Sequence, residues 1–283
     1  MQTEAKFTDG RDYELEEGML LDNKNAVIYG GGGAIGGAVA QAFAREGARV
    51  FLAGRTRAKL DAVADAIAVE GGVAETAQID AFDEQVVNRH ADAIAAKAGG
   101  IDITLNAVGI VHVQGTPFAE LSLDDYTHPI NAYTRTHFIT AKAVARHMTK
   151  KGSGVILTLS TPGSYMPGMG YLGYGVACAA IEGLSRLLAA ELASNAIRVV
   201  CLRPHAIPEA VALGSHSRDV FRPVAKRAGL TIEEMLAGAA TGTLLKRLPT
   251  LAEVAYVAAF MASDRAGAMT GTVANMTCGA LVD

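Results

Sequence analysis

Tryptophan is absent from this 283-residue chain, and cysteine and charged residues are sparse. The three cysteines (Cys178, Cys201 and Cys278) lie far apart with no C-x-x-C spacing, which argues against a disulfide framework and indicates free thiols in a reducing compartment. No Lys/Arg-rich run occurs and the net charge is −4, so nucleic acid is not an expected partner. No His/Cys/carboxylate spacing suggests a metal site.

Long apolar runs are missing too. No uncharged stretch reaches the length of a membrane span, and residues 1–25 are polar and acidic, unlike a signal peptide. The sequence therefore predicts a cytoplasmic protein that does not span a membrane. Half of the residues are apolar and 19% are charged, as in a globular α/β protein. We expect an N-terminal extension over residues 1–22 and one domain over residues 23–283.

Short apolar runs alternate along the chain with longer segments of helical periodicity. Buried strands are predicted at residues 26–29, 49–53, 74–79, 101–108, 155–159, 198–202 and 272–276. Helices are predicted at residues 36–46, 57–69, 83–98, 123–150, 174–193 and 252–262, with Pro129 bending the fourth. Residues 204–246 are expected to be irregular and partly helical. The alternation predicts a single-domain, Rossmann-type, doubly wound parallel sheet with helices on both faces.

The first strand ends in a run of glycines that leads into the first helix. Gly31, Gly33 and Gly36 satisfy the G-x-G-x-x-G spacing in this strand-to-helix context. Such a turn presents backbone N–H groups at a helix N-terminus, which favours a phosphate. A tight turn without a ligand is the alternative, but four successive glycines cost backbone entropy. We therefore predict a dinucleotide-binding loop containing Gly30, Gly32, Gly33, Ala34, Ile35 and Gly36.

The second strand ends in LAGRTR, residues 52–57. Folds that bind NAD usually carry an acidic residue here, which contacts the ribose hydroxyls. A guanidinium at this place can instead pair with the extra phosphate of NADP. Arg55, with Arg57 as a second candidate, favours NADP(H) over NAD. A merely solvated Arg55 is the weaker alternative.

Together these motifs resemble those of the short-chain dehydrogenase/reductase family over residues 21–283. The family's T-G-x-x-x-G-x-G pattern falls on Tyr29–Gly36, with tyrosine replacing the threonine and Ala34 replacing the middle glycine. Its N-N-A-G run appears as NAVG at residues 106–109, and its C-terminal T-G as Thr270-Gly271. The resemblance implies further cofactor contacts from Asp80, Asn106, Val108, Pro204 and Ile207.

The family's catalytic Y-x-x-x-K motif is only half kept. Tyr174 matches the catalytic tyrosine, but Cys178 stands at the lysine position. The family's serine position falls on Thr161, with Ser160 beside it, and either hydroxyl could bind the substrate oxygen. The resemblance also implies that Asn131 supports a water in the proton chain.

Three other side chains compete for roles near Tyr174. Tyr171 could be the working phenol, although a pocket-lining role is favoured. His205 could replace the proton donor because histidine titrates near neutrality, and a histidine satisfied by backbone groups is equally favoured. His112 is expected to line the mouth of the cleft, with a catalytic role as the lesser alternative.

The change from lysine to Cys178 removes a positive charge. In the family's mechanism the lysine anchors the nicotinamide ribose and lowers the pKa of the tyrosine, which is ~10 in free tyrosine. A general acid or base works best when its pKa approaches the operating pH. Oxidation, which needs tyrosinate as base, should therefore suffer more than reduction, in which neutral Tyr174 donates a proton. For Cys178 itself, a small buried core residue is favoured over a reactive thiol.

These observations predict an NADP(H)-dependent oxidoreductase with an atypical catalytic site. It would reduce a carbonyl or enone of a small, fairly apolar substrate. The alternative is an NADP-binding protein without dehydrogenase activity, in a regulatory or non-redox role. Residues 209–246 are expected to form a substrate lid. The resemblance implies a homo-tetramer or homo-dimer assembled through the helices at residues 123–150 and 174–193.

Overall fold

The computed structural model describes residues 18–282, and residues 1–17 of the predicted extension lie outside them. Within the described residues, parallel strands form a seven-stranded sheet in the order β3-β2-β1-β4-β5-β6-β7. The strands are β1 (Asn25–Tyr29), β2 (Arg49–Gly54), β3 (Val73–Gln78), β4 (Ile103–Asn106), β5 (Gly154–Leu159), β6 (Ile197–Pro204) and β7 (Thr272–Met276). This sheet confirms the predicted doubly wound α/β fold. Its order reverses between β1 and β4, where such folds bind ligands.

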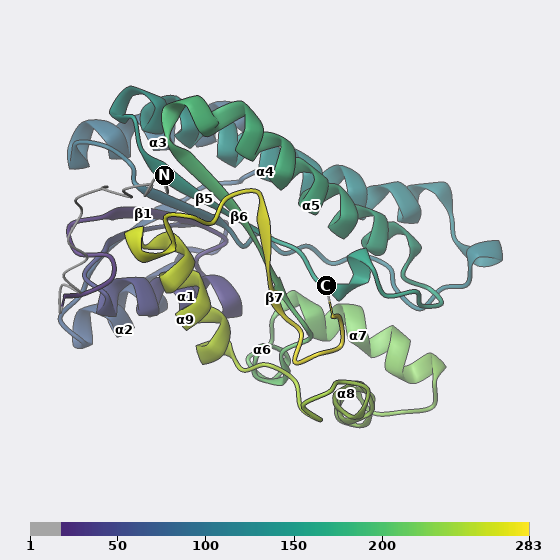
Figure 1. Cartoon of the computed structure of the whole chain (residues 1–283). Coiled ribbons are helices and arrows are strands. Elements are labelled where there is room, and N and C mark those ends of the chain that lie inside the picture. Colours follow the sequence, from purple (N-terminus) through teal and green to yellow (C-terminus); the bar gives the residue numbers. More distant parts are fainter. Residues whose placement is uncertain (1–17, 283) are drawn as a thin grey trace, which may run out of the picture.

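Helices cover both faces of the sheet, with α1, α2 and α9 on one face and α3, α4 and α5 on the other (Figure 1). The stretch expected to be irregular contains three helices, α6, α7 and α8, which gather at one end of the sheet (Figure 1). The helices are α1 (Ala34–Arg45), α2 (Arg57–Val69), α3 (Glu84–Ala98), α4 (Leu123–Lys151), α5 (Leu172–Leu192), α6 (Pro208–Ala212), α7 (His216–Arg227), α8 (Ile232–Thr241) and α9 (Leu251–Ala262).

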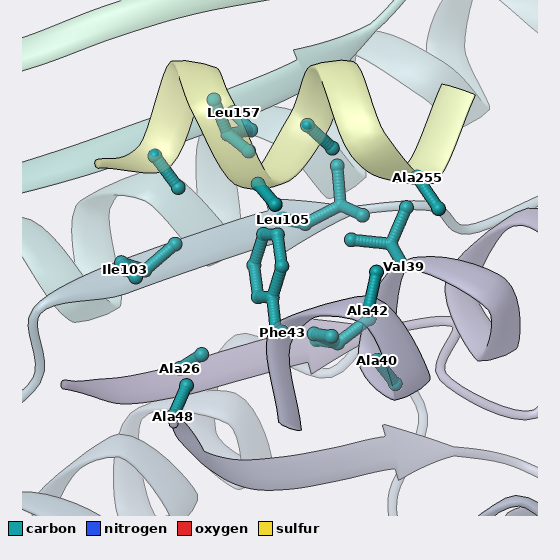
Figure 2. Packing of buried hydrophobic residues seen from close by; sticks show 14 of the residues in the cluster. Ala26, Val39, Ala40, Ala42, Phe43, Ala48, Ile103, Leu105, Leu157 and Ala255 are labelled. Atoms are coloured by element: carbon teal, nitrogen blue, oxygen red, sulfur yellow. The ribbon is translucent and has the colours of Figure 1, made fainter. Parts of the chain in front are cut away.

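The core beneath α1 and α9 combines one aromatic ring with many small side chains. Phe43 of α1 is completely buried and points toward Leu105 of β4 and the alanine-rich face of α9 (Figure 2). Because alanines let α9 approach α1 closely, the ring fills the space between helix and sheet. Truncating such a ring to alanine costs ~3–5 kcal/mol of stability. This packing fixes α1, and therefore the glycines at its start, against the sheet.

Three strands end together where the strand order reverses. Tyr29 of β1 is in register with Ala53 of β2 on one side and with Asn106 of β4 on the other. Strand β4 is shorter than predicted because the Asn106 side chain turns the chain out of the sheet: its Oδ1 accepts a hydrogen bond of 3.0 Å from the Val108 N–H. The loops after β1, β2 and β4 therefore leave the sheet side by side.

Candidate active site

The glycine loop, residues 30–36, is shaped by two positions that admit no side chain. Gly30 has a φ of +80°, and a Cβ there would lie 2.4 Å from the carbonyl oxygen of Ala107. A Cβ on Gly36 would lie 2.3 Å from the carbonyl oxygen of Gly30. The loop therefore folds tightly against the end of β4 because both residues are glycine.

The start of α1 has the chemistry to accept an anion. Its N-cap residue is Gly33, no side chain caps the helix, and its first turn holds no acidic residue. The positive end of the helix dipole and its backbone N–H groups are thus left for a ligand, as in phosphate-binding loops. The residues present fit the pyrophosphate of a dinucleotide. Ile207, the residue before α6, packs with Ala34 and Ile35 of the loop, which brings the end of β6 to the same place.

The remaining sequence-predicted cofactor residues lie around this loop at the strand ends. Pro204 is the buried last residue of β6. Asn106 is buried at the end of β4, where its Nδ2 donates to Thr140 Oγ1 at 3.0 Å. Asp80 is exposed, and its Oδ1 accepts from the Phe82 N–H at 3.0 Å.

The two arginines after β2 differ in what they contact. The Arg57 guanidinium is paired with Asp61, with 2.8 Å between Nε and Oδ1. Arg55 is exposed, and its backbone carbonyl accepts a hydrogen bond of 2.9 Å from Gln78 Nε2. Within residues 18–282, its guanidinium forms no hydrogen bond or ion pair. Thr56 caps α2 without a side-chain hydrogen bond, and the first turn of that helix has no acidic residue. Arg55 and this helix start are therefore available to an anion.

Tyr174 lies in the first turn of α5, between Thr161 from the β5–α5 loop and Cys178 one helical turn onward. Thr161 Oγ1 and Cys178 Sγ are 3.3 Å apart, and both side chains influence the pKa of Tyr174. Burial raises the pKa of Tyr174 well above its ordinary value, with the Cys178 thiol adding to the shift. Burial likewise raises the pKa of Cys178 to about 11. Both side chains are therefore protonated near neutral pH.

Ser160 faces a different partner from Thr161. Its Oγ donates a hydrogen bond of 2.6 Å to Glu182 Oε1, which also accepts from Ser164 Oγ at 2.7 Å. Glu182 forms a fully buried ion pair with Arg203, with 2.9 Å between Oε1 and Nε. Of the two candidate hydroxyls, the structure therefore brings Thr161 to Tyr174, whereas Ser160 donates a hydrogen bond to a buried carboxylate.

The structure does not bring Asn131 to this site, against the prediction. Asn131 is exposed on the outer face of α4, where it lines a shallow pocket with Phe138 and Leu184. Tyr133, two residues further on, is the α4 side chain that reaches Tyr174, with 5.9 Å between ring centroids. The missed signal is helical spacing: Tyr133 shares its face with the buried His137, Thr140, Val144 and Met148.

His112 is buried against Tyr174 instead of lying at the mouth of a cleft. The two rings stack with 4.5 Å between centroids and 20° between planes, and His112 meets Tyr133 edge-on at 5.9 Å. Burial is the main cause that lowers the pKa of His112 to about 4, and the neighbouring His216 and His128 lower it further. His112 is therefore neutral near pH 7. We call His112, Tyr133, Thr161, Tyr174 and Cys178 the catalytic cluster.

The other two competing side chains stay outside this cluster. Tyr171 is the residue before α5, and its ring packs close to Gly168. His205 Nδ1 accepts a hydrogen bond of 2.7 Å from the Ala206 N–H, and burial lowers its pKa. This position agrees with the alternative in which backbone groups satisfy the hydrogen bonding of the His205 ring.

Comparison with known proteins gives the family. The sequence model of the family described as enoyl-(acyl carrier protein) reductase matches residues 32–280. The uncharacterized oxidoreductase YxbG of Bacillus subtilis (strain 168) is 33% identical over 255 residues, which are 89% of this chain and 88% of that protein. A short-chain type dehydrogenase/reductase from Mycobacterium marinum, 28% identical, superimposes with a TM-score of 0.76 over 92% of this chain and 96% of that one. The chain belongs to the short-chain dehydrogenase/reductase family.

A further short-chain dehydrogenase/reductase of known structure is 7α-hydroxysteroid dehydrogenase, complexed with NADH and 7-oxo glycochenodeoxycholic acid. It is 27% identical, with a TM-score of 0.80 and coverage of 92% of this chain and 95% of that one. The present chain is therefore an oxidoreductase of the short-chain type. Among residues 18–282, none of the helices combines the length and the hydrophobicity of a membrane span, and no group of three or more His, Cys, Asp or Glu residues could hold a metal ion.

Among the described residues, the surroundings of Tyr174 hold a hydroxyl and a thiol but no charged group. Thr161 supplies the hydroxyl, and Cys178 supplies the thiol, which is neutral near pH 7. The neighbouring rings of Tyr133 and His112 are uncharged as well, because burial raises the pKa of Tyr133 and lowers that of His112. The side chains in the catalytic cluster are thus all neutral near pH 7.

Proposed function

We propose that this protein is an NADP(H)-dependent reductase of carbonyl or enone substrates. The cofactor preference is supported by Arg55 and the uncapped start of α2, which stand where an NAD-binding fold usually carries an acidic residue. A guanidinium beside backbone N–H groups suits a phosphate monoester. The glycine loop would hold the pyrophosphate, with Asp80, Asn106, Val108, Pro204 and Ile207 around the rest of the dinucleotide.

The neutral catalytic cluster supports reduction, rather than oxidation, as the direction of the reaction. The proposal depends mainly on this observation. A bound nicotinamide dinucleotide would supply the hydride. Tyr174 would donate its phenolic proton to the substrate oxygen, and the Thr161 hydroxyl would orient that oxygen. Because burial raises the pKa of Tyr174, the phenol holds its proton near neutral pH, as a proton donor must. The reverse reaction needs tyrosinate, which this cluster disfavours.

The lid proposed over residues 209–246 lies against the loop that carries His112. In helix α7, the His216 ring sits where a Cβ on Gly109 would lie, 2.2 Å from that position, and Val224 Cγ2 is 3.2 Å from the corresponding position on Gly115. The inner side of the lid is apolar, with Phe221 packed around the buried Leu236 and Val211. A fairly apolar substrate fits such a lid.

The test is NADPH consumption measured against a panel of ketones, quinones and enones. Reduction of at least one class by the wild-type protein, faster than the reverse oxidation at neutral pH, is the expected result. Cys178→Lys should raise turnover by ~10-fold or more, because a cation beside the phenol lowers its pKa. NADPH binding without reduction of any compound by either protein would support the rival function, a cofactor-binding protein without dehydrogenase activity.

We also propose self-association through the outer faces of α4 and α5, and a cytoplasmic location. Phe138 and Leu187 are 51% and 69% exposed on these helices, and Phe138 belongs to the shallow pocket that Asn131 lines. Exposed apolar groups gathered on one face favour an interface with a second copy. Sedimentation analysis should give a dimer or tetramer, which Phe138→Asp should dissociate. Free Cys178, Cys201 and Cys278 support a reducing compartment.

A further inference from the structure

One buried polar side chain beside the catalytic cluster is only partly hydrogen-bonded. Gln114 is 5% exposed, and its Oε1 has no hydrogen-bond partner among the described residues. A buried carbonyl oxygen without a donor is costly, so native folds rarely keep one without a reason. The other buried atoms of this kind, on Tyr29, Arg49 and His90, belong to β1, β2 and α3, away from Tyr174.

His112 determines which end of the Gln114 amide is left unpaired. His112 Nδ1 lies 3.0 Å from the carbonyl oxygen of Ile110, which only accepts, so Nδ1 carries the ring hydrogen. In a neutral imidazole the other nitrogen is then an acceptor. Gln114 Nε2 lies 2.9 Å from His112 Nε2 and donates to it. The amide nitrogen is thereby occupied, and Oε1 is the atom left without a partner.

The unpaired oxygen belongs to the substrate side of the protein. His112, which holds the Gln114 amide, is stacked on Tyr174. The neighbouring Gly115 N–H donates to the carbonyl oxygen of Gly170, at the start of α5, at 2.9 Å. Helix α7 covers the same loop, with His216 against Gly109 and Val224 against Gly115. Gln114 therefore lies where the His112 loop, the loop before α5 and the lid meet.

We infer that Gln114 recognises a hydrogen-bond donor on the substrate, a hydroxyl or N–H group carried near the carbonyl that is reduced. The donor takes the free Oε1, while the lid contacts apolar parts of the molecule. A ketone without such a group leaves the oxygen desolvated and unpaired, and is selected against. The inference rests on the proposed function for the identity of the reacting carbonyl, but donor recognition is a binding property that can be measured by itself.

The experiment compares cyclohexanone with its 2-, 3- and 4-hydroxy derivatives. Each is titrated calorimetrically into the protein saturated with NADP⁺, so that no turnover is needed. At least one hydroxyketone should bind the wild-type protein more tightly than cyclohexanone, on the order of 10- to 100-fold. Gln114→Met should abolish this preference. Gln114→Glu, which keeps an acceptor oxygen at the same place, should retain it.

Gln85→Met is the matched control, because Gln85 is exposed in the first turn of α3, and it should bind all four ketones as the wild type does. Thermal unfolding of each variant verifies that it is folded. Equal or unmeasurable binding of the four ketones by the wild type, or a preference that survives in Gln114→Met, would overturn the inference. Selective binding without NADPH oxidation would leave the inference standing and remove the proposed reduction. Ketone reduction without any Gln114-dependent preference would do the opposite.

Discussion

The glycine loop and the catalytic cluster depend on their sequences in different ways. The loop is defined by what its residues lack, since Gly30 and Gly36 leave no space for a Cβ against neighbouring backbone. Its ligand groups are backbone N–H groups, which many sequences could supply. The catalytic cluster is defined instead by the functional groups of its side chains, such as the Tyr174 phenol and the Cys178 thiol. The first region depends on backbone geometry and the second on side-chain chemistry.

This difference indicates that the fold can retain cofactor binding more easily than proton transfer when its side chains change. A dinucleotide site built from backbone N–H groups would tolerate many substitutions that spare its glycines. Proton transfer needs particular side chains at particular distances, so one change shifts the pKa of its neighbours. Under the proposed function, the neutral surroundings of Tyr174 favour proton donation over proton abstraction, and the glycine loop does not depend on them. Substitutions in the glycine loop should therefore change cofactor binding, whereas substitutions in the catalytic cluster should change turnover.

The largest effect should come from closing the glycine loop. In Gly36→Ala the new Cβ would lie 2.3 Å from the Gly30 carbonyl oxygen, so the loop must move. We expect NADPH affinity to fall by ~100-fold or more and stability by ~2–4 kcal/mol, measured by NADPH fluorescence and thermal unfolding. Gly71→Ala is the control, since Gly71 has a φ of +82° with nothing within 4 Å. It should cost only ~1 kcal/mol and leave binding intact. Unchanged NADPH binding in Gly36→Ala would refute the glycine loop as the dinucleotide site.

The next effect separates chemistry from binding. Tyr174→Phe should lower turnover by ~10²- to 10⁴-fold, the usual worth of a general acid, with unchanged NADPH affinity. Thr161→Val should reduce turnover as well. Ser160→Ala removes the 2.6 Å hydrogen bond to Glu182, so it should lower the melting temperature and leave the rate per folded molecule unchanged. Steady-state kinetics with calorimetry would check all three. Full activity in Tyr174→Phe would assign the acid elsewhere.

The same contrast explains how far the sequence could predict the structure. Alternating apolar runs predicted the sheet because burial on both faces imposes a local pattern. The position of Asn131 could not be predicted in this way. On a helix, Asn131 and Tyr133 lie on different faces, and only contact with α5 decides which face points inward. The buried positions at Tyr133, His137 and Thr140 carried a helical signal, but the resemblance to a motif outweighed it.

Two other features depend on contacts between distant segments. His112 stacks on Tyr174 because two loops meet, which no local pattern encodes. The sequence contains a signal for one of the lid helices. Helix α8 begins with a capping box in which Thr231 and Glu234 satisfy each other's backbone N–H. Helix α7 contains Pro223, which obscured its period. Side-chain chemistry between segments is therefore the part that needed the structure.

A smaller effect tests the cofactor preference. Arg55→Ala should weaken NADPH binding by ~10- to 50-fold, the loss expected for a charge-assisted hydrogen bond, and leave NADH binding unchanged. Arg57→Ala is the control because its guanidinium is already paired with Asp61 at 2.8 Å. It should alter neither affinity by more than ~2-fold. Equal affinities of Arg55→Ala and the wild type for NADPH would disprove the phosphate contact and leave the glycine loop as the basis of binding.

The smallest effect is acid sensitivity of the region around the catalytic cluster. Burial is the main cause that lowers the pKa of both His112 and His137 to about 4, whereas an unfolded chain has the ordinary value of ~6.5. The unfolded state therefore binds more protons between these values, so stability is complete above pH ~6.5 and is lost as the pH falls toward 4. Urea unfolding should show a loss of ~1–2 kcal/mol for each histidine between pH 7 and pH 5. In the wild type, the His137 ring is held by the Tyr133 carbonyl oxygen at 2.8 Å. His137→Gln removes this titrating ring, so the unfolding free energy should fall less steeply with decreasing pH. If the unfolding free energy of the variant depends on pH as that of the wild type does, other groups cause the loss of stability in acid. The neutral histidines would then not distinguish the catalytic cluster from the glycine loop.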